Sequence, residues 1–171
     1  MTYETQSHTF EPVFDQNSRI LILGTFPSVK SREQGFYYGH QRNRFWKLLA
    51  ELTGEPLPES VEEKKQFLLR TGIAVWDVVS SCDIIGSSDS SIKNVVPADL
   101  SRVLSQAPIQ EIFANGGKAY SLYRKYAEPL TGRTAKKLPS TSPANAGWQM
   151  ERLAAEWKQI LQYLDSEKEL R

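Results

Sequence analysis

The strongest constraint on the fold is a short apolar run from Ile20 to Leu23, which Gly24 and Pro27 bring to an end. A continuous run of branched apolar residues is typical of a strand that is buried on both faces, as in a parallel sheet. Aromatic, basic and amide side chains gather shortly afterwards, in residues 36–46. Ligands of open α/β sheets bind beyond the carboxyl ends of strands, so we expect a binding site directly after this strand.

The rest of the chain alternates strand-like and helix-like segments, which predicts a three-layer α/β/α sandwich with a mainly parallel sheet of about four strands. A long segment without periodicity, residues 80–94, is predicted to be a functional loop. We expect one domain over residues 1–171, in which 1–18 is an extension packed through Phe10 and Phe14, and 166–171 is a frayed tail. The predicted strands span residues 19–24, 73–79, 109–113 and 137–138, and the predicted helices span 43–53, 59–70, 98–106, 118–126 and 150–164.

Composition narrows the possible functions only slightly. The net charge is +1, so any nucleic-acid binding depends on a local basic patch. The single cysteine, Cys82, excludes an intramolecular disulfide framework and a cysteine-based metal site, and favours a reducing, cytoplasmic setting. The sequence has no secretion signal and no apolar run long enough to span a membrane. We expect a monomer that needs no metal or organic cofactor and has no membrane partner.

Three predicted loops follow strands and should meet at one edge of the sheet, namely residues 24–43, 115–117 and 140–147. They carry aromatic rings, amides and hydroxyls but few ionisable groups. Aromatic rings stack on bases, amides match the edge of a base, and hydroxyls and helix N-termini hold phosphates. This set of side chains is better suited to binding a nucleotide than to abstracting a proton.

Three motifs occur in order on these strands: Gly24–Ser28 with Tyr38–His40 and Asn43–Trp46, then Phe113–Gly116, then Leu138–Ala146. Together they resemble the motifs of the uracil-DNA glycosylase superfamily over roughly residues 19–165, and most of all its hypoxanthine-DNA glycosylase branch. The resemblance implies a monofunctional DNA-repair enzyme whose partner is DNA with a deaminated base. The enzyme would flip hypoxanthine, or also uracil or xanthine, out of the duplex and leave an abasic site.

One position departs from the pattern of many superfamily members. They carry Asp or Asn two residues after the first glycine, where this chain has Phe26. A phenyl ring does not polarise water, and the hypoxanthine branch uses instead the Asn before Arg-Phe-Trp, which is Asn43 here. An amide is a very weak base, so the implied role of Asn43 is to orient the attacking water rather than to deprotonate it.

The resemblance also assigns roles to other residues. Phe45 would stack on the base, and Asn115 would bind its edge. His40 is a candidate on chemical grounds alone, because a histidine can protonate a leaving base near neutral pH. The turn around Pro143 would fill the gap left in the stack, and nearby hydroxyls would hold phosphates. Lys136 and Lys137 beside this motif are either phosphate contacts or a solvated pair. The full base-binding set is Phe26, Tyr38, Phe45 and Asn115, and the DNA-binding set is Ser28, Ser140, Thr141, Ser142, Pro143, Asn145 and Lys137.

Simpler interpretations stay open at this point. Asn43 is also a suitable helix cap, Asn115 a turn residue, Phe45 a core residue and His40 an ordinary loop residue. Solvated or capping roles are the favoured interpretation of the carboxylates Asp77, Asp83 and Asp89, although Asp89 in the long loop has access to substrate. Two rival functions remain: a mismatch-specific uracil or thymine glycosylase, and a non-catalytic nucleotide- or DNA-binding module.

Overall fold

The computed structural model describes residues 2–164, and the predicted tail at 166–171 lies outside this range. Its centre is a four-stranded parallel sheet, as predicted, and the strand order is β3-β2-β6-β7. The strands are β2 (Ile20–Gly24), β3 (Ile73–Asp77), β6 (Glu111–Asn115) and β7 (Lys136–Leu138). Every residue of β2 and β3 is buried, which explains their continuous apolar sequence.

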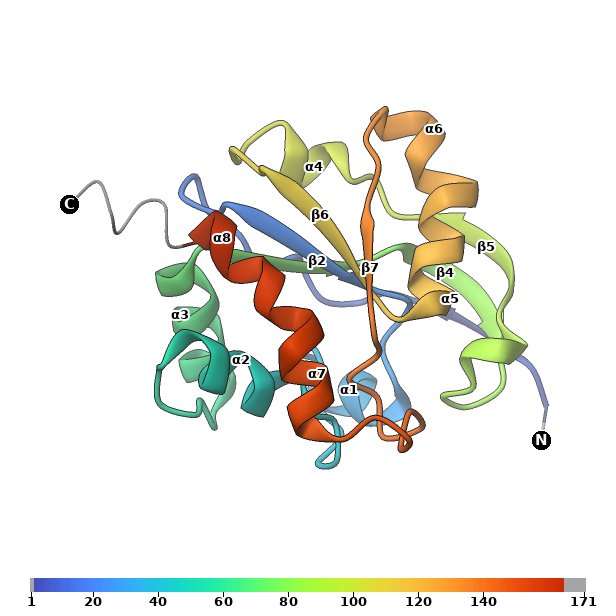
Figure 1. Cartoon of the computed structure of the whole chain (residues 1–171). Coiled ribbons are helices and arrows are strands. Elements are labelled where there is room, and N and C mark those ends of the chain that lie inside the picture. The colour runs from blue at the N-terminus through green and yellow to red at the C-terminus, as the bar shows by residue number, and fades with distance from the viewer. Residues whose placement is uncertain (1, 165–171) are drawn as a thin grey trace.

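The strand register brings the carboxyl ends of the central strands to one level. Gly24 at the end of β2 is paired with Asp77 at the end of β3. On the other side of β2, Leu23 is paired with Ala114, one residue before Asn115. The predicted loops after these strands therefore start from the same edge of the sheet (Figure 1).

Helices cover both faces of this sheet (Figure 1). The chain moves outward in opposite directions from β2 to β3 and from β6 to β7, so right-handed crossovers place the two sets of connecting helices on opposite faces. The helices are α1 (Val29–Gln34), α2 (Phe45–Thr53), α3 (Val61–Thr71), α4 (Ser101–Leu104), α5 (Gly117–Leu122), α6 (Glu128–Thr131), α7 (Met150–Trp157) and α8 (Leu161–Leu164); short 3-10 turns span Asp89–Ser91 and Lys158–Ile160, and a π-helical turn spans Tyr123–Ala127.

A second sheet was not predicted. It is antiparallel, with the order β1-β4-β5, and consists of β1 (Glu4–Ser7), β4 (Val79–Ile84) and β5 (Lys93–Pro97). The prediction that residues 80–94 form one loop was therefore wrong, because only the middle of this segment is a loop. Pairing of β4 with β5 shifts register twice, which breaks the period-two pattern that identifies a strand in a sequence. Pro97 closes β5 instead of opening a helix, and α4 is shorter than the predicted helix over 98–106.

The N-terminal segment packs against the core. Val13 exchanges two backbone hydrogen bonds with Val75 of β3, each 3.0 Å long. Phe10 and Phe14 are partly buried against the core cluster, as expected. His8, directly after β1, donates its backbone N–H to Ser80 of β4, and its ring contacts Asp77 at the end of β3. Within residues 2–164, no helix has the length and apolar character needed to cross a membrane.

Candidate active site

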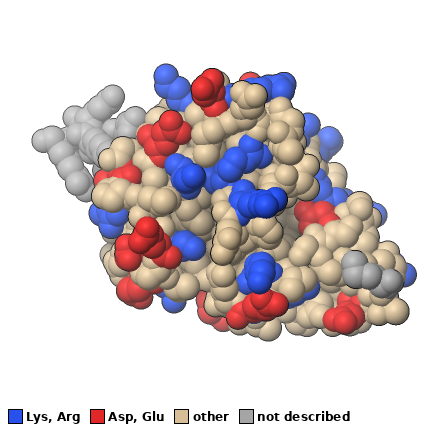
Figure 2. Space-filling model, turned by 90° about the horizontal axis from the view of Figure 1, so that it is seen from below, with Lys and Arg blue, Asp and Glu red and all other residues tan. Residues whose placement is uncertain are grey.

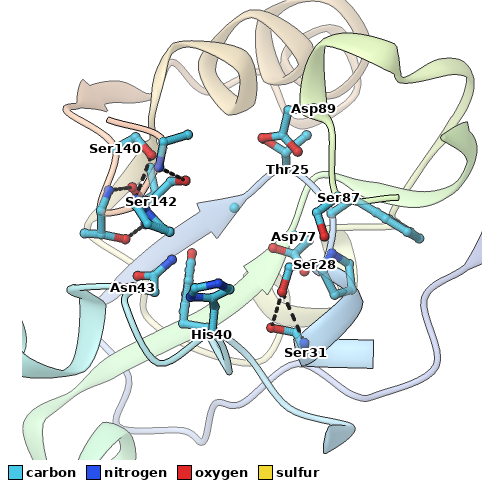
Figure 3. A pocket seen from close by; sticks show the side chains of 18 of the residues that line it. Thr25, Ser28, Ser31, His40, Asn43, Asp77, Ser87, Asp89, Ser140 and Ser142 are labelled. Atoms are coloured by element: carbon cyan, nitrogen blue, oxygen red, sulfur yellow. Dashed lines mark hydrogen bonds between the residues drawn. The ribbon is translucent and has the colours of Figure 1, made fainter. Parts of the chain in front are cut away.

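A cavity of about 620 Å³ lies at the carboxyl ends of β2, β3 and β6 (Figure 3). Its walls come from residues 24–28, from the segment that includes His40 and Asn43, from residues 87–90 and from residues 140–144. Asp77 and Asn115, at the ends of two strands, also line it. The predicted convergence of the three loops is thus confirmed, and the middle of the loop between β4 and β5 adds a fourth wall.

Asn43 combines two roles that the sequence left open. Its side-chain Oδ1 accepts a hydrogen bond of 3.0 Å from the backbone N–H of Phe45, so it caps a free N–H of the first residue of α2, although Arg44 holds the N-cap position itself. Asn43 also lines the cavity beside His40 (Figure 3). An amide oxygen has two lone pairs, so the cap leaves one acceptor position, and the cap bond fixes the orientation of the amide. Asn43 is therefore a rigidly held polar group in the wall of the cavity.

His40 is held in one tautomer. Its Nδ1 accepts a 3.0 Å hydrogen bond from the backbone N–H of Arg42, so the neutral imidazole carries its proton on Nε2. His40 lines the same part of the cavity as Asn43. The ring can consequently donate a hydrogen bond from Nε2 without any change of tautomer.

Arg44 joins the first motif to the third. Its guanidinium donates to three backbone carbonyls of the loop after β7: Ser142 at 3.2 Å, Asn145 at 3.1 Å, and Trp148. Its backbone N–H also donates to the carbonyl of Thr141 at 3.1 Å. A planar guanidinium offers five donors in a fixed geometry, which suits three convergent carbonyls. Sequence reasoning gave Arg44 no role of its own, although it stands directly after Asn43.

Asn115 and Thr141 form a second link between the motifs. The Asn115 amide donates from Nδ2 to the Thr141 hydroxyl and accepts from the Thr141 backbone N–H, both at 3.1 Å. Thr141 has no exposed surface, so the structure does not offer its hydroxyl to a phosphate. Asn115 still lines the cavity, but half of its hydrogen-bonding capacity is used to hold the loop.

The aromatic residues are arranged differently from the prediction. Phe45 has no exposed surface and does not line the cavity. Its ring stacks on Tyr38, with ring centroids 3.9 Å apart, and Tyr38 lies between it and the cavity. Tyr38 thus occupies the place predicted for Phe45, and Phe26 lines the cavity as well. Phe45 follows the simpler interpretation of a core residue.

The remaining predicted DNA contacts lie around the cavity mouth. Ser28, Ser140, Ser142 and Pro143 line the cavity, while Asn145 and Lys137 line an adjoining groove together with Lys118. Ser28 caps α1. The hydroxyl oxygens of Ser140 and Ser142 accept backbone N–H groups, so the O–H groups of these two serines stay available as donors. Figure 2 shows Lys and Arg side chains around the hollow on this face.

Asp77 and Asp89 were assigned solvated or capping roles, and this interpretation was wrong for Asp77. Asp77 is only 4% exposed, and its Oδ2 accepts a 2.8 Å hydrogen bond from Nε2 of His8. Its position at the end of a buried strand was a usable signal, whereas nothing in the sequence indicated His8. Asp89 faces the cavity beside Thr25 (Figure 3). Desolvation raises the pKa of Asp89 to about 6, against the opposing effects of a Thr25 hydrogen bond and Lys118.

The fold and the cavity agree with the comparisons with known proteins. The family model of the Uracil DNA glycosylase superfamily matches residues 11–165, and the chain belongs to this superfamily. A protein of Methanosarcina acetivorans named hypoxanthine DNA glycosylase is 34% identical over 158 residues, which cover 90% of this chain and 97% of the relative. A Methanosarcina barkeri protein of the same name is 34% identical over 137 residues, with 80% and 86% coverage.

A solved structure supports the same assignment. The solution NMR structure of a candidate uracil DNA glycosylase from Methanosarcina acetivorans superposes with a TM-score of 0.78 at 34% sequence identity. The match covers 91% of this chain and 96% of that one. The resemblance of the three motifs to this superfamily is thereby confirmed.

Proposed function

We propose that this protein is a monofunctional DNA glycosylase that hydrolyses the N-glycosidic bond of a flipped deaminated base, with hypoxanthine as its main substrate. The relatives named hypoxanthine DNA glycosylase support this substrate, because they match the chain over most of its length. The observation that carries the proposal is geometric. Asn43, Asp77, Asn115 and the loop 140–144 surround one cavity in a chain of this superfamily.

The chemistry requires little from the protein beyond orientation and charge stabilisation. Water attacks the anomeric carbon of the sugar as the bond from that carbon to the base nitrogen breaks, and the bonding electrons leave with the base. The water gives up one proton to the solvent, and the released base anion takes one up from the solvent. Asn43 uses its free acceptor position to hold and aim the water. His40 donates from Nε2–H to the base as negative charge builds up on it.

Hydrolysis, rather than a covalent route through an amine, fits the groups present. A lysine nucleophile would have to reach the anomeric carbon, and no lysine is among the described residues that line the main cavity. Lys118 and Lys137 lie instead on the adjoining groove, where their charge can meet the DNA backbone. The product is therefore an abasic site with an intact strand.

DNA is held at the cavity mouth. Ser140 and Ser142 offer hydroxyl groups to phosphates around the flipped nucleotide, and Lys137 adds a charge. The Ser28 hydroxyl lines the cavity as well, but it already donates to Ser31. The turn from Pro143 to Asn145 faces the duplex and occupies the space that the base leaves. Arg44 donates hydrogen bonds to backbone carbonyls of this turn, so the turn is held in one shape before DNA binds and can act as a wedge.

The test uses duplexes with one deoxyinosine, deoxyuridine or deoxyxanthosine, each opposite every normal base, followed by alkali to cut abasic sites. We expect strand cleavage after alkali only, and fastest with deoxyinosine. Faster release of uracil opposite guanine than of hypoxanthine would instead indicate the mismatch-specific glycosylase. Binding of these duplexes without release of any base would indicate a non-catalytic module.

A further inference from the structure

Two polar side chains meet above Gly24 on the floor of the cavity. A Cβ atom added to Gly24 would lie 2.4 Å from Oδ1 of Asp77 and 2.9 Å from the hydroxyl oxygen of Tyr38. Any side chain at this position would collide with at least the carboxylate, so the glycine is needed for this close approach. Both residues line the cavity. The strand end thus presents a carboxylate oxygen and a phenol side by side.

The carboxylate is fixed from behind. His8 Nε2 donates to Oδ2 of Asp77 at 2.8 Å, and both side chains are only 5% exposed. His8 packs against Phe10, Phe26 and Tyr37, with ring centroids 4.5 to 6.2 Å away. Oδ2 is occupied by this bond, so Oδ1, the oxygen above Gly24, is the one directed to a ligand. An ionised carboxylate accepts hydrogen bonds and donates none.

The second group above Gly24, the Tyr38 hydroxyl, has an unsatisfied hydrogen-bonding capacity. The Tyr38 hydroxyl is buried and has no partner among the described residues. The Tyr38 ring stacks on Phe45, and the Tyr38 backbone is in the left-handed region at φ 51°. Burial, with a contribution from Asp77 and against the opposing effect of the neighbouring Asn115 side chain, raises the pKa of Tyr38 well above its usual value, so the hydroxyl keeps its proton. A buried O–H without a partner is costly, and such groups are often completed by a ligand.

We propose that Asp77 and Tyr38 together recognise the lactam edge that deamination creates, with His8 as a positioning residue for Asp77. Hypoxanthine presents a ring N–H donor beside a carbonyl acceptor, and uracil and xanthine share this edge. The Asp77 oxygen accepts from the N–H while the Tyr38 hydroxyl donates to the carbonyl. Adenine and cytosine present the reverse order, a bare ring nitrogen beside an amino group, so both contacts are lost. Guanine and thymine keep the same edge, so the two contacts separate hypoxanthine and uracil from their parent bases only, and other contacts must exclude guanine and thymine. This inference rests on the proposed function and names its basis of selectivity.

The first test is Asp77→Asn, measured by single-turnover release of hypoxanthine and by inhibition with free hypoxanthine or adenine. His8 would still hold the amide oxygen, so the amide N–H₂ would face the ring N–H of hypoxanthine. We expect release to fall about 100-fold and the preference of the pocket for free hypoxanthine over adenine to disappear. Unchanged release and preference would overturn the proposal, whereas absence of release by the wild-type protein would overturn the proposed function itself.

Tyr38→Phe separates recognition from folding. The variant loses only a hydroxyl that has no partner in the protein, so its melting temperature should equal or exceed that of the wild type. Hypoxanthine release should nevertheless fall about tenfold, with weaker inhibition by free hypoxanthine. A lower melting temperature with unchanged inhibition would show that the hydroxyl serves the fold, and would contradict its role in recognition.

The role of His8 is tested by two substitutions and a control. His8→Gln can still donate to Asp77 from nearly the same place and should retain most of the preference for hypoxanthine, whereas His8→Phe should lose it. Asp83→Asn is the control, because Asp83 is a carboxylate of β4 that bonds Thr5 and Asn94 away from the cavity. Equal behaviour of the Gln and Phe variants, or loss of preference in the control, would exclude positioning by His8.

Discussion

The two long walls of the cavity are built in different ways. One, the motif wall, consists of residues 40–43 and 140–144 and is held together by Arg44 and by the Asn115–Thr141 pair. The other, the loop wall, consists of residues 85–92 between β4 and β5, and residues 87–90 are exposed. Its hydrogen bonds are mostly internal, such as those of Ser91 with Ile85 and Ser88. Ser87 and Gly86 add single bonds to the α1 region.

The two walls are suited to different tasks, the motif wall to the reaction and the loop wall to DNA binding. Reaction geometry requires groups that are held in place, and the motif wall provides Asn43 and a preformed turn. The loop wall provides a carboxylate, Asp89, on a segment with few external ties, so it can adjust to the bound DNA. We therefore expect substitutions in the motif wall to affect the chemical step, and those in the loop wall to affect binding and its pH dependence.

The largest effect is expected from Asn43→Ala. The variant loses the group that aims the water, and single-turnover release should fall about 1,000-fold. It also loses the helix cap, at a cost of about 1 kcal/mol in the free energy of unfolding. Asn43→Ser is the matched control, because serine restores the cap but is too short to hold the water in the same place. Recovery of activity by serine would mean that the cap alone matters.

Arg44→Ala is expected to have the next largest effect. Loss of three charge-assisted hydrogen bonds to the turn should lower the free energy of unfolding by roughly 2 kcal/mol. The kcat/KM for deoxyinosine duplexes should fall about 30-fold, because the turn and Asn43 lose their common anchor. Arg44→Lys should not restore activity, since one ammonium group cannot span three carbonyls. Lys47→Ala on the exposed side of α2 is the control; an equal loss there would show that the motif wall is not specially tied.

The same contrast explains what the sequence revealed. Strands with unbroken apolar runs, such as β2 and β3, and turns with several polar residues were recognisable, and they led to the motif wall. The loop wall was predicted as part of a longer functional loop, but the strands on either side of it were missed because register shifts break their period-two pattern. The His8–Asp77 contact joins residues 69 positions apart, and no local pattern encodes it. Phe45 and Tyr38 were both candidates for the cavity, and only packing decides which ring lies in front.

Lys137→Ala tests whether DNA follows the groove beside the motif wall. Loss of one phosphate contact should weaken binding about fivefold at low salt and reduce the slope of log K against log salt by about one. Lys136→Ala is a matched control, because Lys136 already donates to the Tyr163 hydroxyl and lies 3.9 Å from a Glu111 oxygen. The prediction fails if both variants change the slope equally.

Asp89→Asn should have the smallest effect and should depend on pH. The pKa of Asp89 is raised to about 6, so its ionisation destabilises the fold: the contribution of Asp89 to stability is greatest below about pH 4 and is lost as the pH rises through 6. Because Asp89 is partly exposed, we expect the variant to gain at most about 1 kcal/mol at pH 7 and nothing at pH 4.

The carboxylate also repels the DNA backbone, so the KM of the wild type should fall about threefold between pH 7 and 5.5, and that of the variant should not. His40 is present in both proteins, so the difference between the two pH profiles isolates Asp89. If the KM of the two proteins changes with pH in the same way, the charge of Asp89 does not affect DNA binding.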